Sequence, residues 1–173
     1  ENEPSLASLH RTIRELEFTL SLDHPNLDRL ADILERHGGF EGYPARLREM
    51  RGQSLKAFLR GFIDLVFEWE GRWYVADYKS NSLPSYGAAA IVEAVQREHY
   101  VLQGLLYSAA AVRYLRTRLT DFDPSTQWGG AMFLFLRGMR GPDAPGASVF
   151  FDAQSTELLE SLESWLGGHD DSR

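Results

Sequence analysis

Residues 61–81 read GFIDLVFEWEGRWYVADYKSN, two strand-like apolar runs separated by Glu70-Gly71. A two-residue turn at this point predicts a β-hairpin and fixes the register of its strands. In that register Asp64 lies directly opposite Asp77, and paired side chains in a hairpin are close neighbours. The stretch therefore predicts two adjacent carboxylates on one face of a sheet.

Lys79 lies two residues beyond Asp77 and is expected on the same face, because side chains alternate along a strand. Like charges placed opposite each other destabilise a sheet, so the two acids need a cation or a shared proton. Carboxylates and backbone carbonyls are the hard oxygen ligands that suit Mg²⁺. The other face is expected to be core and consists of Ile63, Leu65, Phe67, Trp69, Tyr74, Ala76 and Tyr78.

A second interpretation of these charges is structural. In it, Asp64 and Asp77 are solvated edge residues, and Lys79 forms a salt bridge with one of them. In the first interpretation, a lysine beside a metal orients or deprotonates a water, or neutralises charge that builds on a phosphoryl group. The apolar residues around the acids favour this metal-site interpretation.

The composition predicts one globular domain over residues 1–173, with 43% hydrophobic residues and no cysteine. The lack of cysteine excludes disulfides and thiolate metal sites, and it fits a reducing cytosol. No apolar run is long enough to span a membrane. A net charge of -7 argues against an independent, tight DNA-binding module, but not against an enzyme whose substrate is delivered by a partner.

Start and stop signals predict a mixed order of helices and strands, and hence an α/β fold with a mixed sheet flanked by helices. Asp23 is the expected cap of the first helix, with Pro25 in its first turn. Strands are expected in the second half of 11–22 and at 58–69, 72–80, 129–138 and 147–152. Helices are expected at 24–39, at 88–119 as one long or broken helix, and at 155–168; residues 40–53 are expected to form a loop or short helix, and 141–146 a turn.

The acid followed by D-x-K on the paired strand resembles the PD-(D/E)XK nuclease superfamily. Three blocks resemble the C-terminal nuclease domains of RecB type within it: LRGFIDLVFEWEGRWYVADYKSN, YVLQGLLYSAAAVRYLRTRL and GGAMFLFLRGM. The resemblance covers nearly the whole chain, from about Arg11 to Leu166. It implies a restriction-endonuclease-like core and a piece of a longer chain whose upstream helical segment is missing here.

The resemblance also implies the site residues. Mg²⁺, with Mn²⁺ as a substitute, would be held by Asp64, Asp77 and the main chain of Tyr78. Lys79 would be the catalytic lysine, acting with the two aspartates. The Q-x-x-x-Y signature of the family matches Gln103 and Tyr107, which share one helical face and would help to position DNA.

Two departures from the family pattern concern the ligand shell and the helix. The metal-binding histidine of the family lies upstream of this chain, and His10 is not a convincing substitute because it lies just before the first strand. His99 could approach the cleft, whereas the other histidines lie near helix ends or in the tail. Gly104 follows Gln103 where the family has a large residue, so the helix is expected to loosen or break there.

The implied function is a Mg²⁺-dependent exodeoxyribonuclease domain of a helicase–nuclease that acts in double-strand break repair and recombination. Its implied partners are DNA strands fed by the helicase, RecC- and RecD-type subunits and a RecA-type recombinase, in the bacterial cytoplasm. The alternative is a non-catalytic docking platform for a RecA-type recombinase. In that case exposed helices, including residues 154–167, would form the docking surface.

Overall fold

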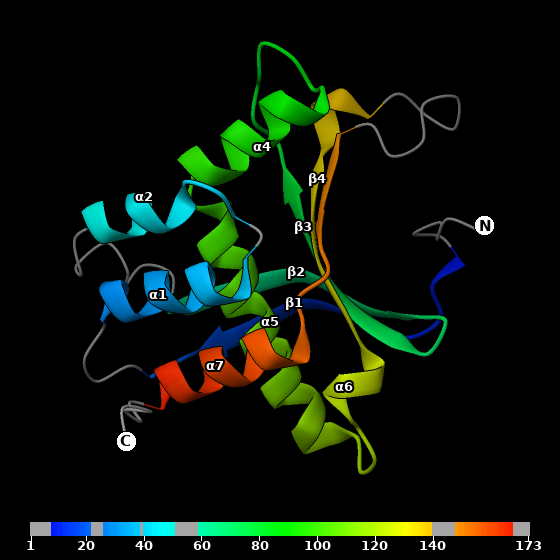
Figure 1. The fold of residues 1–173 in the computed structure, drawn as a ribbon. Coiled ribbons are helices and arrows are strands. Elements are labelled where there is room, and N and C mark those ends of the chain that lie inside the picture. The colour runs from blue at the N-terminus through cyan, green and yellow to red at the C-terminus, as the bar shows by residue number, and fades with distance from the viewer. Residues whose placement is uncertain (1–7, 22–25, 39, 51–58, 140–147, 168–173) are drawn as a thin grey trace.

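A computed structural model describes residues 8–21, 26–38, 40–50, 59–139 and 148–167. Five strands form one sheet in the order β1-β2-β3-β4-β5. In Figure 1 the helices α1, α2, α4, α5 and α7 gather on one side of this sheet. The elements are β1 (Thr12–Thr19), α1 (Leu27–His37), α2 (Tyr43–Glu49), β2 (Arg60–Trp69), β3 (Arg72–Lys79), α4 (Ala88–Arg97), α5 (Tyr100–Arg118), α6 (Pro124–Gln127), β4 (Trp128–Phe135), β5 (Val149–Asp152) and α7 (Thr156–Leu166).

The sheet is mixed, as predicted for an α/β fold. β1 with β2, β2 with β3, and β4 with β5 are antiparallel pairs. β3 and β4 are parallel, and the chain between them passes through α4 and α5. Parallel neighbours need such a crossover connection, which is why the two helices lie against the face of the sheet.

The predicted hairpin register is confirmed over most of its length. Paired residues run from Trp69↔Arg72 to Leu65↔Ala76. Glu70 and Gly71 have φ angles of 49° and 77°. Two consecutive positive φ values at a two-residue turn match the right-handed twist of the strands, so this tight turn sets the pairing.

The assignment of sheet faces needs correction, because both faces of the hairpin are buried. Val66 and Val75, on the face predicted to carry the site, belong to the main core beneath the helices. The face predicted to be core instead forms a smaller cluster around Leu65 and Phe67. Tyr78, also assigned to that core, is 39% exposed.

The helix boundaries agree with the sequence signals except at the first cap and at Gly104. Asn26 caps α1 by accepting a hydrogen bond from Arg29, whereas Asp23 and Pro25 lie outside the described residues. The 88–119 segment is broken at His99, which has a φ of 56°. Gly104 does not break α5, which runs without interruption from Tyr100 to Arg118.

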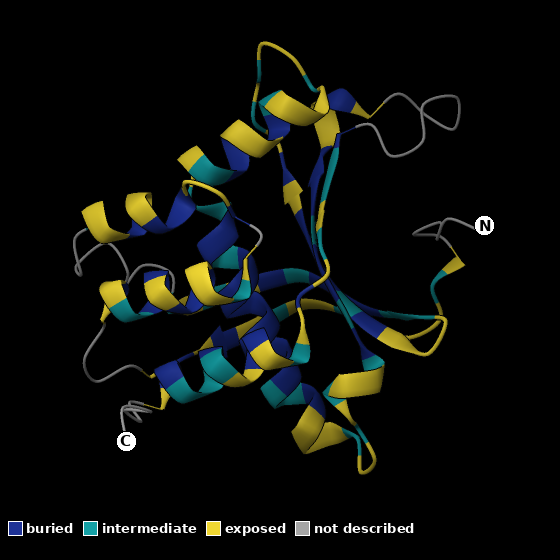
Figure 2. Ribbon diagram, in the orientation of Figure 1, coloured by how far each residue is buried: buried dark blue, intermediate teal, exposed yellow. Residues whose placement is uncertain are grey.

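The apolar side of helix α7 is buried within the domain. Its buried residues pack into the main core, and the exposed residues of its outer side include Glu157 and Glu160. Figure 2 shows the same division on α1, α2 and α4, whereas α5 is buried along most of its length. No helix in the described part of the chain is long and apolar enough to cross a membrane.

Gly130 in β4 is expected to be the least tolerant of the described glycines. Its φ is 130°, and a methyl group there would overlap the carbonyl oxygen of Asp152. Gly130→Ala should therefore lower the free energy of unfolding by about 2 kcal/mol or more. Denaturant unfolding measures this, with Gly61→Ala as the control because its methyl group would meet only ordinary contacts with Phe18. Equal stability of the two variants would contradict the expected strain.

Candidate active site

The alternation of strand β2 is interrupted at Asp64. Ile63 belongs to the main core, whereas Leu65, two residues on, belongs to the cluster on the other face. Across from Asp64, Glu15 of β1 has a φ of 51° and is missing from the ladder of paired residues. Irregularities of this kind re-aim a side chain, and here the re-aimed side chain is a carboxylate.

Asp64 meets β3 through its side chain and not through backbone pairing with Asp77. Its Oδ2 atom accepts a hydrogen bond of 2.8 Å from the backbone N–H of Tyr78. The hairpin ladder stops one residue short of the predicted Asp64↔Asp77 pair. The two acids are nevertheless near enough for the charge of Asp64 to raise the pKa of Asp77.

Asp77 and Lys79 form a buried ion pair. Asp77 Oδ2 lies 2.5 Å from Lys79 Nζ. Only 6% of Asp77 and 8% of Lys79 is exposed. The structural interpretation is thus right that Lys79 pairs with an acid, but the pair is not a solvated edge feature.

Two residues of α5, Gln103 and Tyr107, surround this pair with polar groups. Lys79 Nζ donates to Gln103 Oε1 at 2.6 Å, and Gln103 Nε2 donates to the Tyr107 hydroxyl at 2.8 Å. Tyr107 in turn interacts with the Asp77 carboxylate through its hydroxyl. The spacing of four residues places Gln103 and Tyr107 on one side of the helix, as predicted.

Aromatic rings cover the remaining side of the lysine. Nζ of Lys79 lies 3.7 Å from the centroid of the Tyr100 ring and 5.2 Å from that of Phe133. An ammonium over an aromatic face is attracted by the ring quadrupole, and more strongly when water is excluded. The Tyr100 hydroxyl donates to Asn81 Oδ1 at 3.0 Å, which fixes the ring in place.

Sequence reasoning did not single out Tyr100 or Asn81. The available signal was weak: Tyr100 lies three residues before Gln103 and therefore on the same side of α5. Asn81 follows the D-x-K segment in a loop, where no periodicity indicates its direction. Only the packing of α5 against β3 and β4 brings these groups to the lysine.

Burial controls the titration of the acid and of its tyrosine partner. Desolvation raises the pKa of Asp77 above its ordinary value, and the attraction of Lys79 offsets only part of that rise. Burial also raises the pKa of Tyr107, and the charges of Asp77 and Asp64 add to the effect. Tyr107 is therefore a neutral hydrogen-bond donor at neutral pH.

The donor set at this place fits a small hard cation. Asp64 and Asp77 converge from adjacent strands, and their mutual repulsion is the kind that a divalent ion relieves. Among the described residues, no group of three or more His, Asp or Glu side chains gathers to hold a metal. Mg²⁺ is commonly held by one or two carboxylates together with waters and substrate phosphates, so two acids suffice. A ligand role for the Tyr78 carbonyl stays a prediction.

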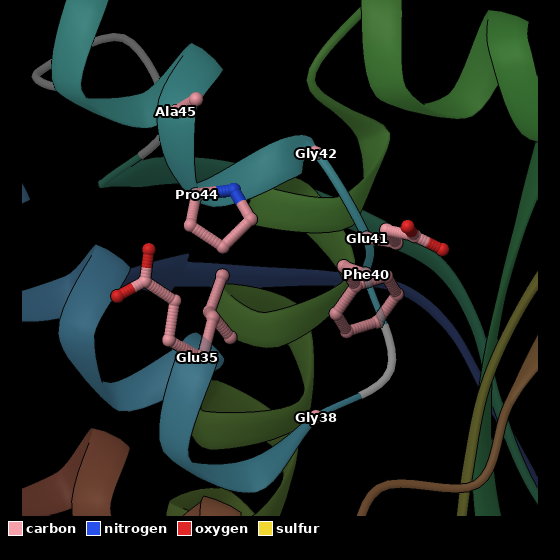
Figure 3. A pocket seen from close by; sticks show the side chains of 8 residues that line it. Glu35, Gly38, Phe40, Glu41, Gly42, Pro44 and Ala45 are labelled. Atoms are coloured by element: carbon pink, nitrogen blue, oxygen red, sulfur yellow. The ribbon is translucent and has the colours of Figure 1, made fainter.

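The described histidines lie elsewhere. His99 Nδ1 is 3.1 Å from the Tyr43 hydroxyl, and His37 Nε2 is 3.0 Å from the Ser161 hydroxyl. His10 is exposed just before β1, while His24 and His169 lie outside the described residues. A hollow of about 330 Å³ between α1 and α2 is shown in Figure 3, and neither Asp64 nor Asp77 lines it. It is lined by Leu34, Glu35, Gly38, Phe40, Glu41, Gly42, Pro44 and Ala45.

The fold and this cluster define a nuclease-like site, and comparison with known proteins identifies its class. Residues 7–167 match the PD-(D/E)XK nuclease superfamily, and the chain belongs to this superfamily.

Within that class, the chain is similar to the RecB subunit of the RecBCD enzyme. It is 35% identical to RecB of Escherichia coli K12 over 158 residues, which cover 89% of this chain and 13% of the relative. Identity to RecB of Mycobacterium tuberculosis H37Rv is 41% over 179 residues, covering 89% of this chain and 16% of the relative. RecB of Haemophilus influenzae Rd is 34% identical over 156 residues, 87% of this chain and 12% of the relative. The chain thus spans only about one-seventh of the length of these relatives.

Tyr107→Phe should raise the pKa of Asp77 further. The hydroxyl interaction with Asp77 favours the charged carboxylate, and the variant removes it while keeping the ring. A pH titration of the Asp77 side-chain carboxyl carbon by NMR measures the change. Tyr78→Phe is the matched control, since Tyr78 is exposed and its backbone N–H, not its ring, meets the acids. An unchanged or lowered pKa in Tyr107→Phe would show that the Tyr107 hydroxyl does not stabilise the Asp77 carboxylate in solution.

Proposed function

We propose that the chain is the divalent-metal-dependent nuclease domain of a RecB-type helicase–nuclease and hydrolyses DNA phosphodiester bonds as an exodeoxyribonuclease. The observation that carries the proposal is the buried Asp77–Lys79 pair beside Asp64. Burying two charges is costly unless their partners are well placed, and such arrangements concentrate at functional sites. The membership in a nuclease superfamily supports the same reaction class.

Each site residue has a role that its contacts support. Asp64 and Asp77 would hold Mg²⁺, or Mn²⁺ in its place, which would supply positive charge to activate a water and to offset charge on the phosphate. The ammonium of Lys79 would orient the attacking water or stabilise the transition state. Its hydrogen bond to Gln103 and its place over Tyr100 hold that ammonium where it is needed.

Gln103 and Tyr107 are better supported as positioning residues for the lysine and the acid than as direct DNA contacts. Gln103 accepts from Lys79 and donates to Tyr107, and the Tyr107 hydroxyl interacts with Asp77. Holding a catalytic group in its productive geometry is a large part of catalysis, because small displacements cost rate. A direct contact of either residue with DNA stays a prediction.

The substrate and partners are inferred from the relatives named as RecBCD subunits. We propose that the domain acts on DNA strands delivered by a helicase, in a complex with RecC- and RecD-type subunits, during double-strand break repair. Delivery by a partner would explain how a chain with a net charge of -7 acts on a polyanion. A RecA-type recombinase as a further partner is also a proposal, and the burial of the apolar side of α7 does not favour that helix as its docking surface.

Asp64→Asn should abolish Mg²⁺-dependent cleavage of linear DNA, with a loss of about 100-fold or more. Asp64 is half-buried and outside the Asp77–Lys79 pair, so this variant should stay folded. Lys79→Ala and Asp77→Ala should lose cleavage as well, but each leaves an unpaired buried charge and needs a thermal-unfolding control. Asp121→Asn, an exposed acid, should cleave normally. Wild-type rates in Asp64→Asn would overturn the proposed site.

Mg²⁺ binding should depend on the same acid. Calorimetric titration of the chain with Mg²⁺, repeated with Mn²⁺, is expected to show binding in the wild type and in Asp121→Asn. Asp64→Asn should lose it, because one of two carboxylate ligands is removed. Binding that is equal in the three proteins would place the metal elsewhere.

A further inference from the structure

Arg137 lies at the end of the sheet where the proposed catalytic lysine lies. Lys79 ends β3 and pairs with Phe135, the last residue of the parallel strand β4. A 3-10 turn, Leu136–Gly138, follows directly and carries Arg137. From this turn, Nε of Arg137 donates a hydrogen bond of 2.8 Å to the carbonyl of Ser80, the residue after Lys79.

Packing makes both sides of this hydrogen bond rigid. Gly138 is buried so closely against Tyr86 and Ser148 that a methyl group there would overlap both. Tyr86 also donates from its hydroxyl to the carbonyl of Asn81 at 2.9 Å, so it holds the loop that begins at Ser80. The guanidinium is therefore fixed relative to Lys79 through its Nε atom.

Within the described residues, the terminal nitrogens of this guanidinium have no hydrogen-bond or ion-pair partner. Arg137 is exposed, and within the described part of the chain no carboxylate lies within ion-pair distance of it. Several other arginines differ in this respect, since Arg11, Arg48 and Arg113 each pair with a glutamate. A planar guanidinium that is held through Nε and belongs to an exposed residue keeps its two NH₂ groups for a ligand, and such a fork binds phosphate oxygens in pairs.

We infer that Arg137 binds a non-scissile backbone phosphate of the DNA strand, next to the site formed by Asp64, Asp77 and Lys79. The inference rests on the proposed function for its substrate. The ligand chemistry is a phosphodiester, whose non-bridging oxygens would accept from the two terminal nitrogens of Arg137. One fixed cation beside the acids would set the register of the strand on a chain that is acidic overall.

The test is the salt dependence of DNA binding in metal-free buffer, where cleavage cannot consume the probe. The probe is a fluorescently labelled oligothymidylate, and anisotropy gives the binding constant at several sodium chloride concentrations. Each phosphate contact to single-stranded DNA contributes about 0.7 to the slope of log K against log salt concentration. Arg137→Ala should reduce the slope by about this amount and weaken binding by roughly tenfold.

Two further variants distinguish a phosphate contact of Arg137 from a purely structural role of its hydrogen bond to Ser80. Arg72→Ala removes the same charge from an exposed position at the opposite end of β3 and should leave the slope unchanged. Arg137→Lys keeps a positive charge and should restore the slope, with weaker affinity because the paired geometry is lost. If Arg137 had only the structural role, Arg137→Ala would be less stable to heat but would leave the slope of log K against log salt concentration unchanged.

The inference is overturned if Arg137→Ala and Arg72→Ala give the same slope. It is also overturned if Arg137→Lys fails to restore the slope, or if the wild-type chain does not bind the probe. The proposed function is judged separately, by Mg²⁺-dependent cleavage in the wild type and its loss in Asp64→Asn. If cleavage follows that pattern while Arg137→Ala binds DNA as the wild type does, the proposed function is supported and the proposed phosphate site at Arg137 is wrong.

Discussion

The buried ion pair of Lys79 and Asp77 is the constraint on which the rest of the site depends. Removing two charges from water costs more than their attraction returns unless other groups complete their hydrogen bonds. Here Gln103 of α5 accepts from Lys79, and Tyr107 of the same helix accepts from Gln103 and interacts with Asp77. That helix must lie close to the sheet, and Gly104 allows it, since a methyl group there would stand 3.3 Å from the ring of Phe133. The glycine that looked like a weakness in the helix is explained by this close approach.

The position of α5 is set by the break that precedes it. His99 takes a left-handed conformation between α4 and α5, and its ring packs edge-on against Tyr43 with centroids 5.8 Å apart. Non-glycine residues adopt that conformation infrequently, although histidine does so more often than most, and the ring of His99 is held there by its contact and hydrogen bond with Tyr43. His99, which was considered for the cleft, lies instead at the turn between α4 and α5, from which α5 crosses toward β3.

The sequence predicted the parts of the site that depend on local rules. The tight turn at Glu70-Gly71 fixed the hairpin register, and a four-residue spacing placed Gln103 beside Tyr107. The face of the hairpin that the helices cover was assigned wrongly. Both faces are apolar, so the alternation of side chains did not indicate which face the helices cover. The interruption at Asp64 and the approach of Tyr100 and Arg137 could not be predicted either. The interruption lies in the pairing of β1 with β2. The approach of Tyr100 and Arg137 follows from the parallel pairing of β3 with β4, which joins segments far apart in the chain.

The apolar character of both faces has a consequence for how the hairpin folds. A slip of β3 by one residue moves every side chain to the other face, yet most of its residues would still meet apolar neighbours. Asp77 and Lys79 are the exception, because the slipped strand would turn them toward the face of the apolar cluster around Leu65 and Phe67 and away from Gln103 and Tyr107. The misaligned hairpin is therefore penalised by the same charges that the native one accommodates, and the site residues help to select the correct strand alignment before any substrate is present.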